Sequence, residues 1–286
     1  MTVAEQLHVT KAALVLNMTQ SAASASIAAL EARCKAKLFN RVGRTIELTL
    51  AGRLFLVEAK AVLARVEQAE FVLDELSGLK RGKLKLYASQ TIASYWLPAY
   101  LHRFRALYPQ VTLELAIGNT SQAAQAVVAG TADLGFIEGE ANDPALVRLP
   151  VPGDRLVLVA APDHPLSRLK RPSAHELANA PWVLREPGSG TRQIFEAALQ
   201  DYGIDVSQLN VILELPSNEA VRSAVEAGAG ASVISRLVVN SSLNAGALKL
   251  LEFPFPQRRF FAIRHIGRQR GNAEEALLSL IRPQQP

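Results

Sequence analysis

The chain has 286 residues, of which 49% are hydrophobic and 20% charged; this composition excludes an intrinsically disordered protein and leaves room for two or three domains. No apolar run reaches the roughly 18 residues of a membrane span, no secretory signal pattern opens the sequence, and the single cysteine excludes a disulfide framework, so we expect a cytoplasmic protein. The formal net charge is +5, and residues 1–60 hold most of it, with eight Lys and Arg against four Glu. Such a basic region suits either a polyanion-binding module or an inert basic surface.

Two short helices joined by a tight turn are predicted near the N-terminus, at residues 10–17 and 19–34, and together they form a helix-turn-helix unit. Thr10 and Thr19 are the candidate N-caps. Residues 38–49 then predict a small β-hairpin with arginines on both sides of its turn.

The helix at residues 19–34 carries few long side chains, because it is built mostly of alanine and serine. Its apolar residues predict one narrow buried stripe of Ala23, Ile27, Leu30 and Cys34. Cys34 is therefore interpreted as a small buried hydrophobe rather than a reactive thiol. The bare outer face would let this helix approach another surface closely.

A long helix is predicted at about residues 50–79, with Thr49 as its cap. Its apolar residues alternate spacings of four and three, which is the heptad pattern of a coiled coil. An apolar seam on so long a helix needs a partner, which is either the helix's own domain or a second copy of the chain. Gly78 and the KRG stretch at 80–82 end the helix and turn the chain away from it, which favours the second copy. The predicted pairing residues are Phe55, Ala59, Val62, Val66, Ala69, Leu73 and Leu76.

From Lys83 onward, strands and helices alternate, which predicts parallel sheets in two similar α/β lobes. We expect lobe I at about residues 83–157 plus 264–286 and lobe II at about 158–263. The predicted strands and helices are, in order, strand 83–89, helix 94–109, strand 111–119, helix 120–130, strand 132–139, a strand from 155, strand–helix pairs over 181–203 and 210–235, strand 260–266 and helix 272–281.

Four of these helices begin in short polar loops that directly follow strands, and in open α/β sheets such junctions lie at the edge where ligands bind. A helix N-terminus offers free N–H groups and a partial positive charge. Plain N-capping would explain any one junction, but four junctions across two lobes favour a site for a small anion. The candidate residues, including Glu138 at the end of the third strand, are Ser89, Gln90, Thr91, Asn119, Thr120, Ser121, Glu138, Gly188, Ser189, Thr191, Ser217 and Asn218.

Catalytic and metal-binding patterns are not found in the sequence. The PGSGT stretch at 187–191 lacks the lysine of a phosphate-binding Walker loop, and no G-x-S-x-G nucleophile motif occurs. The five histidines show no metal-ligand spacing. We expect no catalytic residue, no metal and no cofactor.

Residues 4–52, AEQLHVTKAALVLNMTQSAASASIAALEARCKAKLFNRVGRTIELTLAG, resemble the winged helix-turn-helix of LysR-type transcriptional regulators. The matching stretches are TKAA at 10–13, LN at 16–17, TQSA at 19–22, LFNR at 38–41 and LT-AG at 48–52. The linker helix and the two lobes are similar as well, so the resemblance covers nearly the whole chain. SQTIASYWLP at 89–98 and REPGSGTR at 185–192 resemble the branch that regulates sulfur assimilation and carbon fixation.

This resemblance implies an all-α winged helix-turn-helix at residues 1–50, a dimerisation helix at 51–80, and an effector domain at 83–286 with Rossmann-like lobes similar to periplasmic binding proteins. It implies double-stranded DNA and RNA polymerase as partners, a homodimer or homotetramer, and a small co-inducer between the lobes. Gln20 suits a bidentate contact with adenine, and Ala25 a thymine methyl. The DNA-binding residues are expected to be Lys11, Thr19, Gln20, Ser21, Ser24, Ala25, Arg41 and Arg44, with Lys11 and the two arginines near phosphates.

Three features depart from the family pattern. The chain begins near the end of the family's first helix, so about ten preceding residues are expected from an upstream start, or the head is weakened. Lys35 stands where the family has a helix-ending glycine, and a left-handed conformation there costs about 1 kcal/mol. Ala25, Ala28 and Ala29 stand where arginine or glutamine is common.

Two alternatives belong to other functional classes. A small-solute-binding protein without DNA function would show no salt-dependent DNA affinity. An enzyme that uses the space between the lobes would need a nucleophile with its base, and the sequence shows no such pair.

Overall fold

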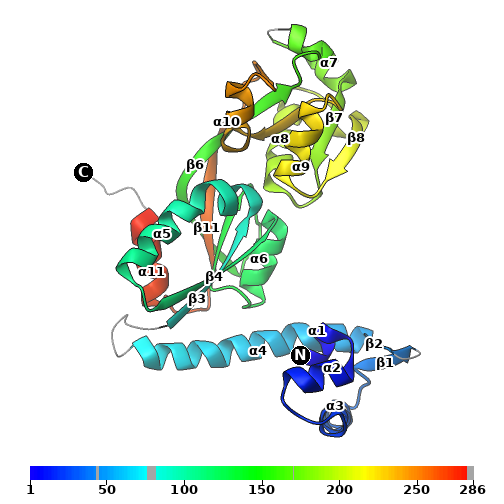
Figure 1. Cartoon of the computed structure of the whole chain (residues 1–286), viewed down its shortest axis with the longest axis vertical. Helices are drawn as coiled ribbons and strands as arrows, with labels where there is room; N and C mark the ends of the chain where they lie inside the picture. The colour runs from blue at the N-terminus through cyan, green and yellow to red at the C-terminus, as the bar shows by residue number, and fades with distance from the viewer. Residues whose placement is uncertain (43–44, 76–81, 170, 282–286) are drawn as a thin grey trace. The chain divides into compact units, whose positions relative to one another are not determined.

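The computed structural model describes residues 1–42, 45–75, 82–169 and 171–281, and it divides into two compact units, largely residues 1–71 and largely residues 72–286 (Figure 1). Among the described residues, no single helix is long and apolar enough to cross a membrane. The helices Val9–Val15 and Gln20–Cys34 reach that length and hydropathy only together, as a pair bent by 106°.

The first unit contains the predicted helix-turn-helix, hairpin and long helix. Its elements are α1 (Thr2–Gln6), α2 (Val9–Val15), α3 (Gln20–Cys34), β1 (Phe39–Val42), β2 (Thr45–Leu48) and α4 (Leu50–Glu75). β1 and β2 pair antiparallel from Phe39 opposite Leu48 to Val42 opposite Thr45. Thr19 caps α3 as predicted, because its hydroxyl accepts from Ala22 N. The predicted Thr10 cap is wrong: α2 begins two residues earlier, and the His8 ring accepts from Lys11 N.

Lys35 ends α3 in the left-handed conformation that the missing glycine predicted, with φ of 50°. Its N–H and that of Ala36 bond back to Ala32 O and Glu31 O and so close the last turn. A lysine therefore carries the strain that a glycine would avoid.

The stripe predicted on α3 is correct in its first half and wrong in its second. Ala23 is buried and Ile27 half-buried, but Leu30 is 37% exposed and Cys34 is exposed. Glu31 takes the inward position instead, because the backbone N–H groups at the start of β1 need an acceptor.

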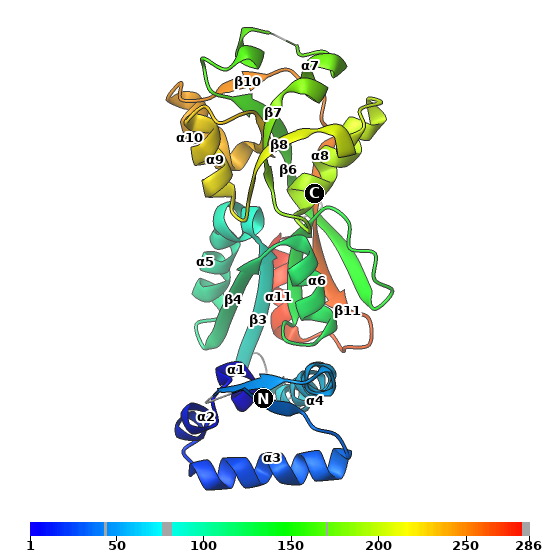
Figure 2. The same ribbon diagram turned by 90° about the vertical axis from the view of Figure 1, so that its right-hand side faces the viewer.

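Lobe I of the second unit is a sheet with helices on both faces. Its elements are β3 (Gly82–Ser89), the π-helix η1 (Ile92–Trp96), α5 (Leu97–Leu107), β4 (Val111–Gly118), α6 (Thr120–Val128), β5 (Leu134–Glu138) and α11 (Asn272–Ile281). β3 pairs parallel with both β4 and β5, as predicted. α6 covers one face, while α5 and α11 lie together on the other (Figures 1 and 2).

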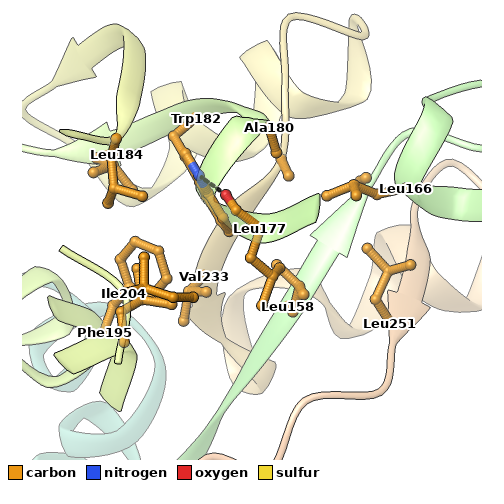
Figure 3. Packing of buried hydrophobic residues seen from close by; sticks show 14 of the residues in the cluster. Leu158, Leu166, Leu177, Ala180, Trp182, Leu184, Phe195, Ile204, Val233 and Leu251 are labelled. Carbon is orange, nitrogen blue, oxygen red and sulfur yellow. Dashed lines mark hydrogen bonds between the residues drawn. The ribbon is translucent and has the colours of Figure 1, made fainter. Parts of the chain in front are cut away.

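Lobe II has the same layered plan. Its elements are η2 (Pro165–Arg168), α7 (Ala174–Asn179), β7 (Pro181–Arg185), α8 (Gly190–Asp201), η3 (Val206–Gln208), β8 (Asn210–Leu215), α9 (Asn218–Glu226), β9 (Ser232–Ser235), α10 (Arg236–Asn244) and β10 (Lys249–Leu251). α7 and α8 pack on one face around Trp182 and Phe195, and α9 and α10 pack on the other (Figure 2). Figure 3 shows the first of these cores, in which the buried indole N–H of Trp182 donates to Leu177 O at 3.0 Å.

Two long antiparallel strands, β6 (Leu146–Ala160) and β11 (Gln257–His265), run from one lobe into the other (Figure 1). β11 pairs with β5 from Phe260 to Ile263, in lobe I, whereas β6 pairs with β9 from Leu156 to Val159, in lobe II. The crossing therefore lies near residues 152–155 and 257–259, before the expected boundaries at 157 and 263. The expected boundaries followed the apolar runs, which continue through a crossing strand without a break.

Candidate functional site

The N-terminal turn of α3 presents small polar side chains to solvent. Gln20, Ser21 and Ala25 are exposed, and Ser24 is half-buried. The Ser21 hydroxyl lies 3.0 Å from the Thr19 hydroxyl, so Ser21 is partly engaged with the cap. Of the four α3 residues predicted to contact DNA, Gln20 and Ala25 are exposed and lie outside the cap contact.

The basic residues expected near phosphates are described only in part. Lys11 is exposed on α2. Arg41 lies in β1 opposite Ile46, but its side chain is not described, and Arg44 falls outside the described residues.

A buried carboxylate fixes the wing hairpin to α3. Glu31 Oε1 accepts from Leu38 N at 2.8 Å and from Phe39 N at 3.2 Å, and Lys37 Nζ lies 2.7 Å from Oε2. Burial alone would raise the pKa of this carboxyl, but these hydrogen bonds outweigh it and hold the pKa below its ordinary value. The hairpin is therefore held by a charge-assisted network that the sequence pattern did not reveal.

On α4, the described side chains of the predicted seam are exposed or half-buried. Val62 and Val66 are 63% and 50% exposed, while Phe55 and Ala59 are half-buried. The side chains of Ala69 and Leu73 are not described, and Leu76 lies outside the described residues.

In the second unit, the polar residues predicted at strand–helix junctions meet between the two lobes; we call this region the lobe interface. Gln90 bonds lobe II twice, since its Nε2 donates to Pro216 O at 2.9 Å and its Oε1 accepts from Asn218 N at 2.9 Å. Asn218 Nδ2 also donates to Thr91 Oγ1 at 3.0 Å, and both residues are fully buried. Ser217 caps α9 through Ala220 N. N-capping alone therefore explains a serine at this position, without a ligand.

A second contact joins the start of α6 to the loop before α8. Ser121 N donates to Gly188 O at 3.3 Å, and Asn119 Nδ2 donates to Glu186 Oε1 at 3.2 Å. Asn119 also caps α6 through Gln122 N. Glu186 was not among the residues predicted from the sequence.

A third contact surrounds Glu138, which is 2% exposed. Ser89 Oγ donates to its carboxylate, and Thr120 Oγ1 donates to its backbone carbonyl at 2.6 Å. Gly190 packs against that carbonyl so closely that an added Cβ would lie 2.0 Å from the oxygen. The glycine is needed for this approach of α8 to lobe I.

Arg258, another residue missed by the sequence reasoning, anchors the crossing strands. Its Nε and Nη2 each lie 2.5 Å from the Asp154 carboxylate, and its Nη1 donates to Thr191 Oγ1 at 2.9 Å. Glu138 Oε1 is 3.9 Å from the same Nη1. A fully buried guanidinium with these partners links both lobes where β6 and β11 cross between them.

Ser189 completes the predicted set. It is 2% exposed and precedes α8 without a side-chain capping bond. All twelve predicted residues thus lie at the junctions that form, or directly flank, the lobe interface. Within the described parts of the chain, no group of three His, Cys, Asp or Glu residues could hold a metal.

Two family descriptions match this chain. Residues 1–53 match "Bacterial regulatory helix-turn-helix protein, lysR family", and residues 77–286 match "LysR substrate binding domain". The chain belongs to the LysR family of bacterial transcriptional regulators. This LysR-family protein is 37% identical over 276 residues to the uncharacterized HTH-type transcriptional regulator YeiE of Escherichia coli K12, with 96% of this chain and 92% of YeiE covered. It is 34% identical over 245 residues to the probable RuBisCO transcriptional regulator of Cyanidioschyzon merolae, with 85% and 81% covered.

Solved structures agree with the fold of this regulator. Full-length CbnR complexed with its target DNA matches with a TM-score of 0.72 at 19% identity, covering 98% of this chain and 95% of CbnR. The regulatory domain of Synechocystis PCC6803 CcmR in complex with 2-PG matches with a TM-score of 0.64 at 28% identity, covering 70% and 96%. The predicted winged head with a two-lobed effector domain is confirmed, and the protein is a DNA-binding transcriptional regulator rather than an enzyme.

Proposed function

We propose that this regulator binds a small anionic effector at the lobe interface and that the bound effector changes how its heads engage DNA. The observation that carries this proposal is the meeting of polar residues from both lobes, above all Gln90 and Thr91 with Asn218. A molecule that replaced these contacts would favour one spacing of the lobes over another. Such differential binding is the requirement for an effector to shift a conformational equilibrium.

At the DNA end, α3 is proposed to enter the major groove. Gln20 would contact a base, Ala25 a thymine methyl, and Lys11, Arg41 and Arg44 phosphates. The exposure of Gln20 and Ala25 supports this assignment. Thr19, Ser21 and Ser24 would position the helix start, because their side chains are committed to the cap or half-buried.

The active form is proposed to be a dimer through α4 that pairs into a tetramer through the effector domains. The exposed seam residues of α4 support the dimer. Among the described strands, β4 and β8 are edge strands, and Ile117 and Ile212 are 52% and 42% exposed on them. Unpaired apolar edges favour contact with another copy. A cytoplasmic location and contact with RNA polymerase fit the same role.

The experiment that tests the effector proposal is a thermal-shift screen of the full chain with sulfate, phosphate, sugar phosphates and aromatic carboxylates, followed by DNA-binding titrations with each hit. Thr91→Ala removes the hydroxyl that accepts from Asn218 and is expected to abolish the shift. Ser94→Ala, an exposed change in the same segment, is the matched control. If Thr91→Ala responds to every hit as the wild type does, the site assignment is wrong. If the wild type shows no salt-dependent DNA affinity, a solute-binding protein without DNA function is the better reading.

A further inference from the structure

The Glu186 carboxylate bridges the two lobes in the structure. Its Oε1 accepts from Asn119 Nδ2 of lobe I at 3.2 Å and from Arg185 Nη2 of lobe II at 2.9 Å, and its Oε2 accepts from Arg185 Nε at 2.8 Å. One carboxylate thus occupies the bidentate edge of a guanidinium and an amide donor from the facing lobe at the same time.

Arg185 is a buried cation whose position is set by lobe II. Its side chain is 3% exposed, and its Nη1 donates to Asn218 Oδ1 at 2.6 Å, at the start of α9. The remaining edge, Nε and Nη2, must face an anion, because an unpaired buried guanidinium is costly. Glu186 is the immediate neighbour in sequence and fills that edge from the rim, with 23% of its side chain exposed.

The loop that carries Glu186 lies tightly against lobe I. A Cβ at Gly188 would lie 3.2 Å from Ser121 Cβ and 3.3 Å from Asn119 Nδ2. Because the Glu186 carboxylate accepts from both Arg185 and Asn119, its withdrawal would free both donors together. Asn218 would still hold the Arg185 guanidinium in place. Both donors would then be available to another anion of similar geometry.

We propose that Glu186 is a built-in competitor that holds the effector's own place, and that the effector is an oxyanion with two or more oxygens on one centre, which displaces Glu186 from Arg185 and Asn119. This inference rests on the proposed effector role of the lobe interface. Displacement follows because a second anion cannot accept from Nε and Nη2 of Arg185 while the Glu186 carboxylate occupies that edge. The Glu186 carboxylate thus raises the anion concentration needed for binding, because the anion must displace a carboxylate that is always present.

The test is isothermal titration of the full chain with sodium sulfate and with inorganic phosphate. Glu186→Gln keeps the size of the side chain but removes the competing charge, and it is expected to bind at least one of the two anions about tenfold or more tightly than the wild type does. Glu219→Gln is the matched control, because Glu219 also bridges the lobes, through Tyr95 at 2.9 Å, but does not contact Arg185. Its anion affinity is expected to equal that of the wild type.

A second pair of variants distinguishes the loss of the competing charge from a folding defect. Glu186→Asp keeps the charge on a shorter side chain and is expected to lie between wild type and Glu186→Gln, and adding Arg185→Gln to Glu186→Gln is expected to remove the gained affinity. The inference is overturned if Glu186→Gln binds neither anion more tightly than wild type, or if the double variant keeps the gain.

DNA titrations with and without the anion separate this inference from the proposed function. Tight anion binding by Glu186→Gln with unchanged DNA binding would leave the inference standing and refute the effector role. If another compound changes DNA binding but Glu186→Gln binds the anions only as tightly as wild type does, the effector role stands and the inference about Glu186 is refuted.

Discussion

Gln20 at the start of α3 and Lys11 on α2 are both exposed, but they offer different chemistry to DNA. A glutamine amide can pair with one base, whereas a lysine ammonium attracts phosphates of any sequence. We predict that Gln20→Ala lowers discrimination at one base pair of each half-site by about 1–3 kcal/mol. Fluorescence anisotropy with a panel of single-base operator variants measures this change.

Lys11→Ala is the comparison for that prediction. It is expected to weaken binding to all of these operators equally and to reduce the slope of log affinity against log salt by about one. A sequence-dependent loss in Lys11→Ala, or a uniform loss in Gln20→Ala, would contradict the assignment of the two residues.

Single residues also show where sequence reasoning was sufficient. The Thr19 cap and the left-handed Lys35 were predicted because both follow from backbone geometry within one turn. Glu31, Glu186 and Arg258 were missed, because their roles depend on partners brought close only by the fold. For Glu31 the available signal was a charged residue within a helix built mostly of alanine and serine, and such a residue does not identify its partner.

At the scale of elements, the approach of α8 to lobe I depends on Gly190. An added methyl group would lie 2.0 Å from Glu138 O and 2.7 Å from Thr120 Oγ1, so backbone must move. We predict that Gly190→Ala keeps the lobes apart, lowers the stability of the effector domain by about 1–3 kcal/mol, and removes the effector response while the heads still bind DNA.

Small-angle scattering would measure the separation of the lobes, urea unfolding the loss of stability, and fluorescence anisotropy the effector response of DNA binding. Gln200→Ala, an exposed change at the other end of α8, should behave as wild type. Wild-type scattering and wild-type effector response in Gly190→Ala would refute the role of the glycine.

Glu274 is a buried carboxyl in the first turn of α11. Burial raises the pKa of this carboxyl to about 7 from 4.5, with Arg264 opposing the rise and Asp133 adding to it. Glu274 Oε1 and Arg264 Nε lie 3.9 Å apart, and neither atom has a hydrogen-bond partner. The folded state therefore keeps this proton to a higher pH than the unfolded chain does.

The sign follows from linkage: a carboxyl whose folded pKa is raised contributes stability that is complete below about pH 4.5 and is lost as the pH rises to about 7. We predict a loss of up to about 3 kcal/mol between pH 4.5 and pH 7.5, measured by urea unfolding. Glu274→Gln should flatten this dependence, and Glu275→Gln, on the exposed side of α11, should not. Equal slopes in wild type and Glu274→Gln would show that this carboxyl does not carry the effect.

Whole elements were predicted more reliably than their division into lobes. The βαβαβ order of lobe I and the terminal helix at 272–281 agree with the structure, because alternating apolar patterns and helix breakers mark each element. α7 was missed because its six residues are too few to produce a clear helical period, and α10 was not predicted although it is as long as α6 and α9. The lobe boundary was displaced because β6 and β11 belong to both lobes.

At the scale of the whole molecule, DNA affinity should depend on pairing through α4. Two linked heads bind two half-sites with an effective concentration that one head lacks, which is worth roughly 10²–10⁴ in affinity. Val62 and Val66 lie exposed on the predicted seam, so Val62→Glu with Val66→Glu is expected to give a monomer in analytical ultracentrifugation without unfolding the head. Its affinity for DNA with two half-sites should fall at least about 100-fold, to the level of DNA with one half-site. Val57→Glu, with Val57 54% exposed but off the seam, should leave the assembly and the preference for two half-sites unchanged. A double variant that remains a dimer, or a monomer that still prefers two half-sites, would mean that α4 does not join the heads.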